Sequence, residues 1–407
     1  MNKELSIKQN MLYNSIGKVL YLFFQWLTTV VIVKIAGFSD AGVLALAISI
    51  TSTIYSISAF GMRNYQSSDI NNKFSYGDYF NSRIFTCIIS LFICFLFLLF
   101  TNYSFNVKLC IFAYMIFRIS EAIVDVLHGE EQKIWRMDII GKSFIIRGFI
   151  MFLSYFITLY VTKNLLYAIL TMDVLLFISV YFYDFKKFGN LIGHLKKFDK
   201  NFFPLIVVCL PLAVYTLCNN AVTFFPKFFL ERHYGTEILG IYSSIASPLC
   251  IVQTSASLLF DPLVTLFAEY FNKGDIKAFT KLLFRVSLII IGILIFGLVG
   301  IILFGKPVFT ILYNKEILNY FYVVYQVLFT TILTAFVWFL CTILIVIRKI
   351  KILMYSSIIS LIINAILSCV LVPRFGLSGV TMVLIITLII QALCATLSCY
   401  IGLRERK

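Results

Sequence analysis

Long apolar stretches alternate with short polar ones along almost the whole chain. Apolar runs of about 20 residues recur, and a run of this length crosses the hydrocarbon core of a bilayer as a helix. Strands of a membrane barrel would instead alternate apolar and polar positions. We therefore expect an all-α polytopic membrane protein with twelve spans, near residues 11–33, 41–62, 84–101, 108–127, 143–161, 164–183, 203–226, 238–260, 285–304, 317–347, 352–372 and 376–402.

Composition supports this class, and the placement of charge predicts the topology. The 407-residue chain is 61% hydrophobic and 13% charged, and its net charge is +15. With a cytoplasmic N-terminus, 23 of the 34 Lys and Arg residues fall on the cytoplasmic side, 8 on the outer side and 3 inside spans. This bias follows the positive-inside rule. We expect both termini in the cytoplasm and no nucleic-acid partner.

Weak internal similarity predicts two lobes of six helices each. Residues 40–42 resemble residues 238–240 at an offset of 198, and residues 76–79 resemble residues 273–276 at an offset of 197. Parallel repeats of this kind are a known transporter design, with the substrate held between the repeats. The expected organisation is an N-terminal lobe, a cytoplasmic linker and a C-terminal lobe, over residues 1–183, 184–202 and 203–407.

The linker and the seventh span each have a distinctive pattern. In residues 184–202, apolar residues share one helical face and lysines lie away from it, which favours a helix in the cytoplasmic membrane interface. A solvated linker is the alternative. In the seventh span, Asn219 and Asn220 lie between Pro211 and Pro226. Because proline bends or breaks a helix, this segment is a candidate gating helix, with a static kink as the alternative.

Charged residues inside the spans are the candidate functional residues. The stretch FRISEAIVDVLHGEEQ, residues 117–132, places Arg118, Glu121 and Asp125 on one helical face. Lys18, Arg147 and Asp173 also lie inside first-half spans. Each ionised group near a helix centre costs about 2.5–3.5 kcal/mol on insertion scales, so such groups face a bundle interior or a hydrated cavity.

Two interpretations of these charges remain open. They form internal ion pairs, Arg118–Glu121 and Arg147–Asp173, or they line a wet cavity. In that cavity the cations would receive an anionic substrate, and Glu121, Asp125 or Asp173 would titrate or bind a coupling ion. Between residues 286 and 403, by contrast, the predicted spans contain no charged residue.

Enzyme and metal templates find little support. The three histidines fall in separate predicted loops, and the chain has no Walker motif and no GxSxG motif. The ten cysteines lie in or beside spans without a CxxC pair, which favours packing roles over metal ligation. We expect no enzymatic activity, no metal site and no bound cofactor.

The segment HGEEQKIWRMDIIGKSFIIRG, residues 128–148, resembles the Wzx-type polysaccharide flippases. Its acidic helix end is followed by a Gly-x-x-Gln loop (Gly129 and Gln132), Arg-Met-Asp and Gly-Lys-Ser. The opening NMLYNSIGKVLYLFFQWLTTVVIVKIAG and the segment FGMRNYQSSD look similar to the same family. The resemblance covers essentially the whole chain.

The resemblance implies the two-lobe fold of the multidrug/oligosaccharidyl-lipid/polysaccharide exporter superfamily. It implies ion-driven movement, by H+ or Na+, of an undecaprenyl-diphosphate-linked oligosaccharide to the outer leaflet of a bacterial plasma membrane. Lys18, Arg63, Arg118 and Arg147 match the cationic cavity residues of the family in type and place. Membrane lipids, a polysaccharide polymerase and a chain-length regulator are the implied partners. The uncharged second-lobe spans depart from the family's pattern.

Two other functions fit a chain of this class less well. A multidrug or cation exporter of the same fold would favour a net acidic cavity, whereas this one has at least three cations against three carboxylates. A membrane polymerase or ligase acting on the same lipid would usually carry a large outer loop. The longest predicted outer loops, near 227–237 and 305–316, are too short for that.

Overall fold

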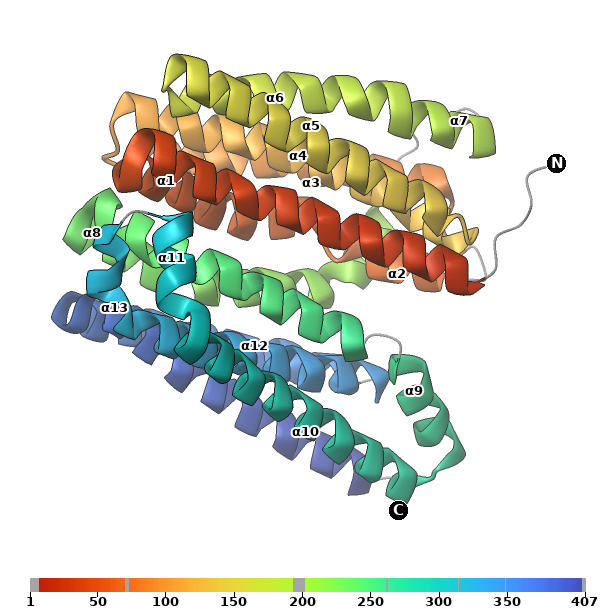
Figure 1. Ribbon diagram of the computed structural model, residues 1–407. Coiled ribbons are helices and arrows are strands. Elements are labelled where there is room, and N and C mark those ends of the chain that lie inside the picture. The colour runs from red at the N-terminus through yellow and green to blue at the C-terminus, as the bar shows by residue number, and fades with distance from the viewer. Residues whose placement is uncertain are drawn as a thin grey trace. The chain divides into compact units, whose positions relative to one another are not determined.

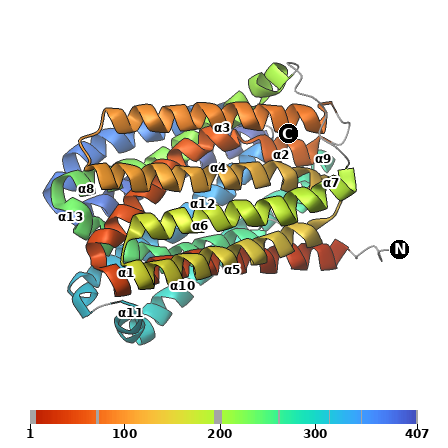
Figure 2. The same ribbon diagram turned by 90° about the horizontal axis from the view of Figure 1, so that it is seen from above.

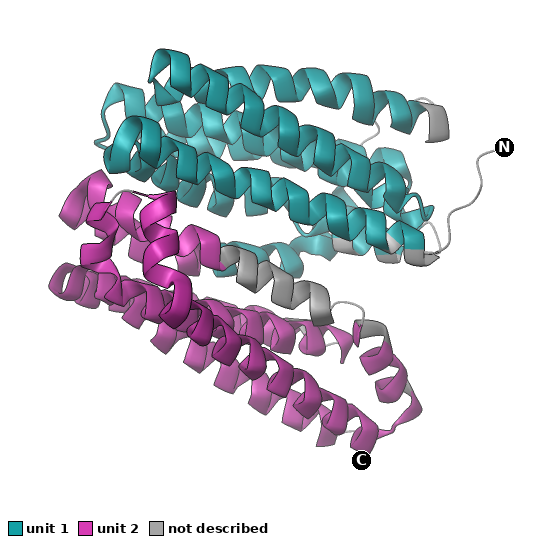
Figure 3. Cartoon of the chain, viewed as in Figure 1, with its two compact units in different colours: residues 1–220 teal, residues 221–407 magenta. Residues whose placement is uncertain are grey.

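The computed structural model describes residues 7–69, 73–192, 202–260, 263–313, 315–347 and 349–404. The chain divides into two compact units, Met1–Asn220 and Ala221–Lys407 (Figure 3). The boundary falls inside a helix, whereas the sequence predicted lobes of residues 1–183 and 203–407. The predicted linker is described only up to residue 192 and from residue 202, so the interfacial helix stays a prediction.

Unit 1 is a bundle of long helices (Figures 1 and 2). Helix α1 packs against α3, α4 and α5, and α6 packs against α4 and α5. The elements are α1 (Ile7–Ala59), α2 (Met62–Ser68), α3 (Tyr76–Leu99), α4 (Phe105–Lys133), α5 (Met137–Thr162), α6 (Leu165–Ser179), the π-helical η1 (Val180–Phe185) and α7 (Lys186–Ile192).

Unit 2 holds most of α8, which begins in unit 1, together with the helices that follow it. Within it, α12 packs against α10 and α13. The elements are α8 (Phe203–Phe260), α9 (Val264–Lys273), α10 (Ile276–Gly300), the π-helical η4 (Ile301–Gly305), α11 (Lys306–Leu312), the 3-10 helix η5 (Lys315–Tyr320), α12 (Tyr322–Val346) and α13 (Ile350–Arg404).

Three of the long helices are pairs of spans joined at a glycine. Helices α1, α8 and α13 depart from helical backbone angles at Gly37, Gly235 and Gly376. In the described part of the chain, eight helices are long and apolar enough to cross a membrane, and these three are among them. Counting each pair as two spans and adding the charged helix α4 reproduces the twelve predicted spans. The prediction of an all-α polytopic membrane protein is confirmed.

Helices α1 and α5 approach each other closely where Gly17 meets Gly141. A Cβ atom added to Gly17 would lie 2.3 Å from the carbonyl oxygen of Gly141, and one added to Gly141 would lie 2.3 Å from that of Tyr13. No larger residue fits, and small residues at a crossing let two membrane helices approach closely. Further along both helices, the guanidinium group of Arg147 in α5 lies over the ring of Tyr21 in α1.

Candidate functional site: two arginine clusters on helix α4

Helix α4 presents Arg118, Glu121 and Asp125 on one face, as predicted, and each carboxylate meets arginine. Arg118 Nη1 lies 2.5 Å from Glu121 Oε2. Its Nη2 donates to Ser52 Oγ of α1 at 2.8 Å, and Tyr21 donates its hydroxyl proton to Glu121 Oε1 at 2.5 Å. The predicted Arg118–Glu121 ion pair is therefore present. We call Arg118, Glu121, Tyr21, Ser52 and Arg147 the Glu121 cluster.

Arg147 belongs to this cluster through an aromatic ring rather than a carboxylate. Its guanidinium carbon lies 5.6 Å from the centre of the Tyr21 ring, and the residue is 2% exposed. The Nε and Nη2 atoms of Arg147 have no hydrogen-bond partner. Both carboxylate oxygens of the buried Asp173 in α6 also lack one, so the Arg147–Asp173 ion pair considered from the sequence does not form.

The second cluster gathers around Asp125, one turn further along α4. Arg63 Nη1 of α2 lies 3.1 Å from Asp125 Oδ1, and Arg83 Nη2 of α3 lies 3.0 Å from Oδ2. Arg83 also donates to the carbonyl oxygen of Ser58 at 2.7 Å, and Arg63 donates to Gln132 Oε1 at 3.3 Å. We call Arg63, Arg83, Asp125 and Gln132 the Asp125 cluster.

Arg83 is the member of this cluster that sequence reasoning missed. The predicted third span began at residue 84 and left Arg83 in a cytoplasmic loop, but α3 begins at Tyr76 and Arg83 is fully buried. The start of the helix is fixed by Ser75 and Asp78, whose side chains cap each other's backbone N–H groups. This Ser-x-x-Asp spacing is a helix-start signal readable in the sequence.

Both clusters carry more positive charge than negative charge. Each has two arginines for one carboxylate: Arg118 and Arg147 for Glu121, and Arg63 and Arg83 for Asp125. Apart from the fully buried Arg83, the ion-paired side chains of the two clusters are 13–26% exposed. They are therefore largely shielded from bulk water, but a ligand can still contact them. Such a site suits an anion, because guanidinium forks match the oxygens of phosphate and carboxylate groups.

The remaining predicted cation and the predicted gating residues lie on α1 and α8, and Asn220 Nδ2 donates to Ser56 Oγ at 2.6 Å. Lys18 is half-buried in α1, one turn before Tyr21. Helix α8 keeps helical backbone angles past Pro211, Asn219 and Asn220 and is interrupted at Gly235 instead. The expectation of a helix broken beside the prolines is therefore corrected, since the glycine alone takes a left-handed angle. A gating role for this segment stays a prediction.

The inner end of α4 is helical where the sequence predicted a loop. His128, Gly129 and Gln132 all lie within α4. His128 is buried, with Nε2 at 3.6 Å from Asp184 Oδ1 of η1. Gly129 leaves room for Gln66, which donates to Glu130 Oε2 at 3.1 Å. The acidic tail of the helix therefore packs against neighbouring helices.

A buried carboxylate anchors the turn between α2 and α3. Asp69 accepts hydrogen bonds from the backbone N–H groups of Lys73 and Phe74, at 2.9 and 3.1 Å, and from the Tyr79 hydroxyl at 3.1 Å. Burial acts to raise the pKa of Asp69, but these three donors outweigh it and hold the pKa below its usual value. The turn positions the α2 helix, which carries Arg63.

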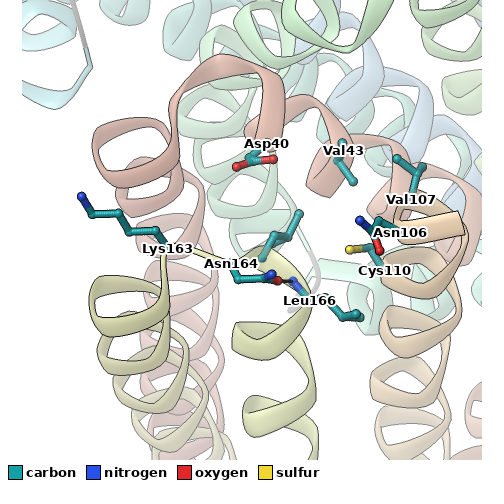
Figure 4. A pocket seen from close by; sticks show the side chains of 9 residues that line it. Asp40, Val43, Asn106, Val107, Cys110, Lys163, Asn164 and Leu166 are labelled. Atoms are coloured by element: carbon teal, nitrogen blue, oxygen red, sulfur yellow. Dashed lines mark hydrogen bonds between the residues drawn. The ribbon is translucent and has the colours of Figure 1, made fainter. Parts of the chain in front are cut away.

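Two cavities lie at opposite ends of α4. At its start, a cavity of about 190 Å³ is lined by Asp40, Asn106, Lys163 and Asn164 among others (Figure 4). Asn164 is already engaged there, because its side-chain oxygen caps the first turn of α6. At the end of α4, a larger cavity of about 640 Å³ adjoins the Asp125 cluster.

Comparison with known proteins shows which proteins share this fold. The chain is 24% identical over 388 residues to the capsular polysaccharide biosynthesis protein CapF of Staphylococcus aureus, covering 93% of this chain and 96% of that protein. An outward-facing multidrug resistance MATE family transporter of the MOP superfamily superposes with a TM-score of 0.63 and 14% identity, over 99% of this chain and 97% of that one. The chain has the fold of the MOP-superfamily membrane transporters.

Further comparisons agree with that conclusion. An inward-facing MATE family transporter of the MOP superfamily matches with a TM-score of 0.61 and 11% identity, over 100% of this chain and 96% of that one. No protein-family model matches the chain. The predicted resemblance to polysaccharide flippases of the superfamily is thus confirmed by a polysaccharide biosynthesis relative and by the transporter fold.

Proposed function

We propose that this protein is a flippase for a lipid-linked oligosaccharide, carrying an undecaprenyl-diphosphate-linked repeat unit from the cytoplasmic to the outer leaflet of a bacterial plasma membrane. The observation that carries the proposal is the pair of clusters on α4, in which three arginines are ion-paired with two carboxylates and a fourth, Arg147, lies over the Tyr21 ring. A lipid diphosphate presents two adjacent phosphoryl groups, and each cluster has one positive charge more than it has negative charge.

In this proposal Glu121 and Asp125 hold the arginines in place when no lipid is bound. A buried charge without a counter-ion is costly, so the carboxylates keep Arg118, Arg63 and Arg83 ordered in an empty site. The phosphates then meet preorganised guanidinium groups. Arg147, whose Nε and Nη2 lack partners, is the donor with the most unused hydrogen-bonding capacity.

The rest of the cargo follows from the properties of the fold. The prenyl chain stays in the surrounding lipid, while the sugars need a hydrated path. The relative CapF is named for capsular polysaccharide biosynthesis, and proteins of the same fold are known in outward-facing and inward-facing conformations. Both facts support transport of a polysaccharide precursor by alternating access. A polymerase and a chain-length regulator acting on the exported unit are the proposed partners.

Asp173 is the proposed ion-coupling carboxylate. Glu121 and Asp125 are bound to arginine, whereas Asp173 is 4% exposed and neither of its oxygens has a hydrogen-bond partner. An ionised carboxylate buried without a partner is strongly disfavoured. Taking up and releasing a proton during the cycle is the role that suits it, with Na+ as the alternative ion.

The test measures surface polysaccharide and protein abundance in cells that carry single variants. Arg118→Ala and Lys18→Ala should abolish surface polysaccharide at normal abundance, whereas Arg285→Ala, which removes an exposed arginine of α10, should leave it unchanged. Arg147→Met should also abolish polysaccharide, and it should not lower the thermal stability of the purified protein. Normal polysaccharide in both Arg118→Ala and Lys18→Ala would overturn the site.

A cation exporter of the same fold is the competing function. It would use the carboxylates of α4 to bind its substrate, and these are already neutralised by arginine. A whole-cell efflux assay with cationic dyes separates the two functions. Efflux that is lost in Glu121→Gln, together with unchanged polysaccharide, would favour the exporter.

A further inference from the structure

The cavity at the inner end of α4 has the composition of a carbohydrate site rather than of a second phosphate site. It measures about 640 Å³ and is lined by Ser67, Glu130, Gln132, Lys133, Ile134, Trp135 and Met137. Small-molecule sites in proteins span about 300–1,000 Å³. Glu130 and Lys133 balance each other's charge, and Gln132 adds both a donor and an acceptor. A neutral ligand rich in hydroxyl groups fits this lining.

Trp135 is the only aromatic residue among the described residues that line the cavity, and it is 55% exposed. Its backbone is left-handed, with φ at 60°. The N–H of Arg136 donates to the carbonyl of Glu131, and the N–H of Trp135 donates to that of Gln132. These two hydrogen bonds define a Schellman motif with Trp135 at the position that glycine usually occupies.

The same motif is closed by glycine elsewhere in the chain. At the end of α9, the N–H of Gly274 bonds to Phe271 and that of Asp275 bonds to Tyr270, with Gly274 at φ 72°. A bulky residue at such an angle is an outlier, and backbone strain of this kind collects at functional sites. Phe60 and Lys163 also have a positive φ, so Trp135 is set apart by carrying a large exposed ring at this angle beside the cavity.

The cavity is joined to the Asp125 cluster by one shared side chain. Gln132 lines the cavity, and its Oε1 accepts a hydrogen bond from Arg63 Nη2 at 3.3 Å. Glu130 is fixed in turn by Gln66 at 3.1 Å. A phosphate held by Arg63 would thus have a sugar attached to it within reach of the Trp135 ring.

We propose that this cavity binds a sugar of the lipid-linked oligosaccharide, with the Trp135 ring stacked on the apolar face of the sugar and with Glu130 and Gln132 bonded to its hydroxyl groups. The proposal rests on the proposed function and deepens it, because it separates recognition of the glycan from recognition of the diphosphate. The exposed face of an aromatic ring suits a sugar, because a sugar ring also has an apolar face.

The experiment compares two lipids on the purified full-length protein in lipid nanodiscs. One probe is undecaprenyl diphosphate, and the other is the lipid-linked oligosaccharide extracted from the producing strain after deletion of this gene. Wild type should bind the glycosylated lipid about tenfold more tightly than the bare one, the size of effect typical of an aromatic anchor. Trp135→Ala should bring the ratio of the two affinities close to one, and Trp135→Phe should keep most of it.

Two further variants guard against a general loss of structure. Trp135→Gly relieves the left-handed strain, so its melting temperature should equal or exceed that of wild type while the preference for the glycan disappears. Trp338→Ala removes another exposed tryptophan, on α12, and should leave the ratio unchanged. A ratio that survives in both Trp135→Ala and Trp135→Gly, or equal weakening of both lipids, would overturn the sugar site alone. Failure of wild type to bind undecaprenyl diphosphate would overturn the proposed function instead.

Discussion

The two units share a backbone design and differ in what they bury. Among the described residues of unit 2, every buried polar side chain is Ser, Thr, Asn or Gln. Asn364 donates to Thr387 at 3.2 Å, and Thr381 donates to Gln326 at 2.7 Å. Unit 1 also buries ionisable side chains, which are Asp69, Arg83, His128, Glu131, Asp138, Arg147, Asp173 and Asp184 among its described residues.

The backbone duplication makes this difference informative. Gly37 has φ 87° and ψ −178°, and Gly235 has φ 82° and ψ 174°. The two glycines are 198 residues apart, the offset of the sequence repeat, and each joins the first two spans of its half. The two halves therefore share this glycine hinge and, among the described residues, differ in buried charge. Burying charge is expensive, so its restriction to unit 1 among the described residues favours the proposal that the substrate is bound there.

Arg83→Ala should have the largest effect, because it leaves Asp125 partly unpaired in a buried site. Breaking a buried ion pair costs about 3–5 kcal/mol, whereas Lys273→Ala, which removes the exposed Lys273–Glu269 pair of unit 2, should leave the free energy of unfolding almost unchanged, because water and salt screen an exposed pair. Unfolding of both purified variants measures the contrast. Replacing both partners, as Arg83→Met with Asp125→Leu, should restore much of the stability without restoring export. Equal costs for Arg83→Ala and Lys273→Ala would remove the contrast between the units.

Asp69→Asn should come next and should depend on pH. It weakens three hydrogen bonds to a buried charge, each worth about 1.5–3 kcal/mol. Because the folded pKa of Asp69 is depressed, its stabilisation is present above the ordinary aspartate pKa and disappears as the pH falls through the folded value. The stability gap between wild type and variant should therefore close in acid. Asp275→Asn, which changes an exposed cap of α10 in unit 2, should show a smaller gap.

Gly37→Ala and Gly235→Ala should cost similar amounts, about 1–3 kcal/mol each. A Cβ at either position meets nothing within 4 Å, so the whole cost comes from the backbone angle. Thermal unfolding of the two variants, compared side by side, tests whether the hinges are equivalent. A cost at only one of them would show that the two halves share sequence spacing without sharing a mechanical role.

Asn364→Leu should have the smallest effect. Hydrogen bonds between membrane helices average about 0.6 kcal/mol, and the Asn364 side-chain oxygen already lacks a partner. Surface polysaccharide in cells expressing this variant should be normal. Loss of polysaccharide at normal abundance would mean that the neutral polar groups of unit 2 also contact the cargo.

Several site residues could be recognised from the sequence because a charge in an apolar run is conspicuous. Arg118, Glu121 and Asp125 stand out in this way, and helical periodicity alone puts them on one face. Arg83 escaped because the predicted span began one residue too late for it, although the Ser75–Asp78 capping pair marks the earlier start. The sequence suggested Asp173 as the partner of Arg147, and the structure places Arg147 over the Tyr21 ring instead, because a sequence does not say which helix faces meet.

The sequence by itself determined the membrane class, the number of spans, their grouping by charge and the residues of the α4 face. These follow from the free energy of moving side chains between water and hydrocarbon, which acts on each segment separately. Only the tertiary structure decided that Arg83 joins Arg63 on Asp125, that Arg147 rests on Tyr21, and that Trp135 closes a helix where glycine is usual. These side-chain contacts depend on which helices are neighbours and on how far each is shifted along its axis relative to the other. Contacts between distant parts of the chain, such as that between Gly17 and Gly141, fix those positions.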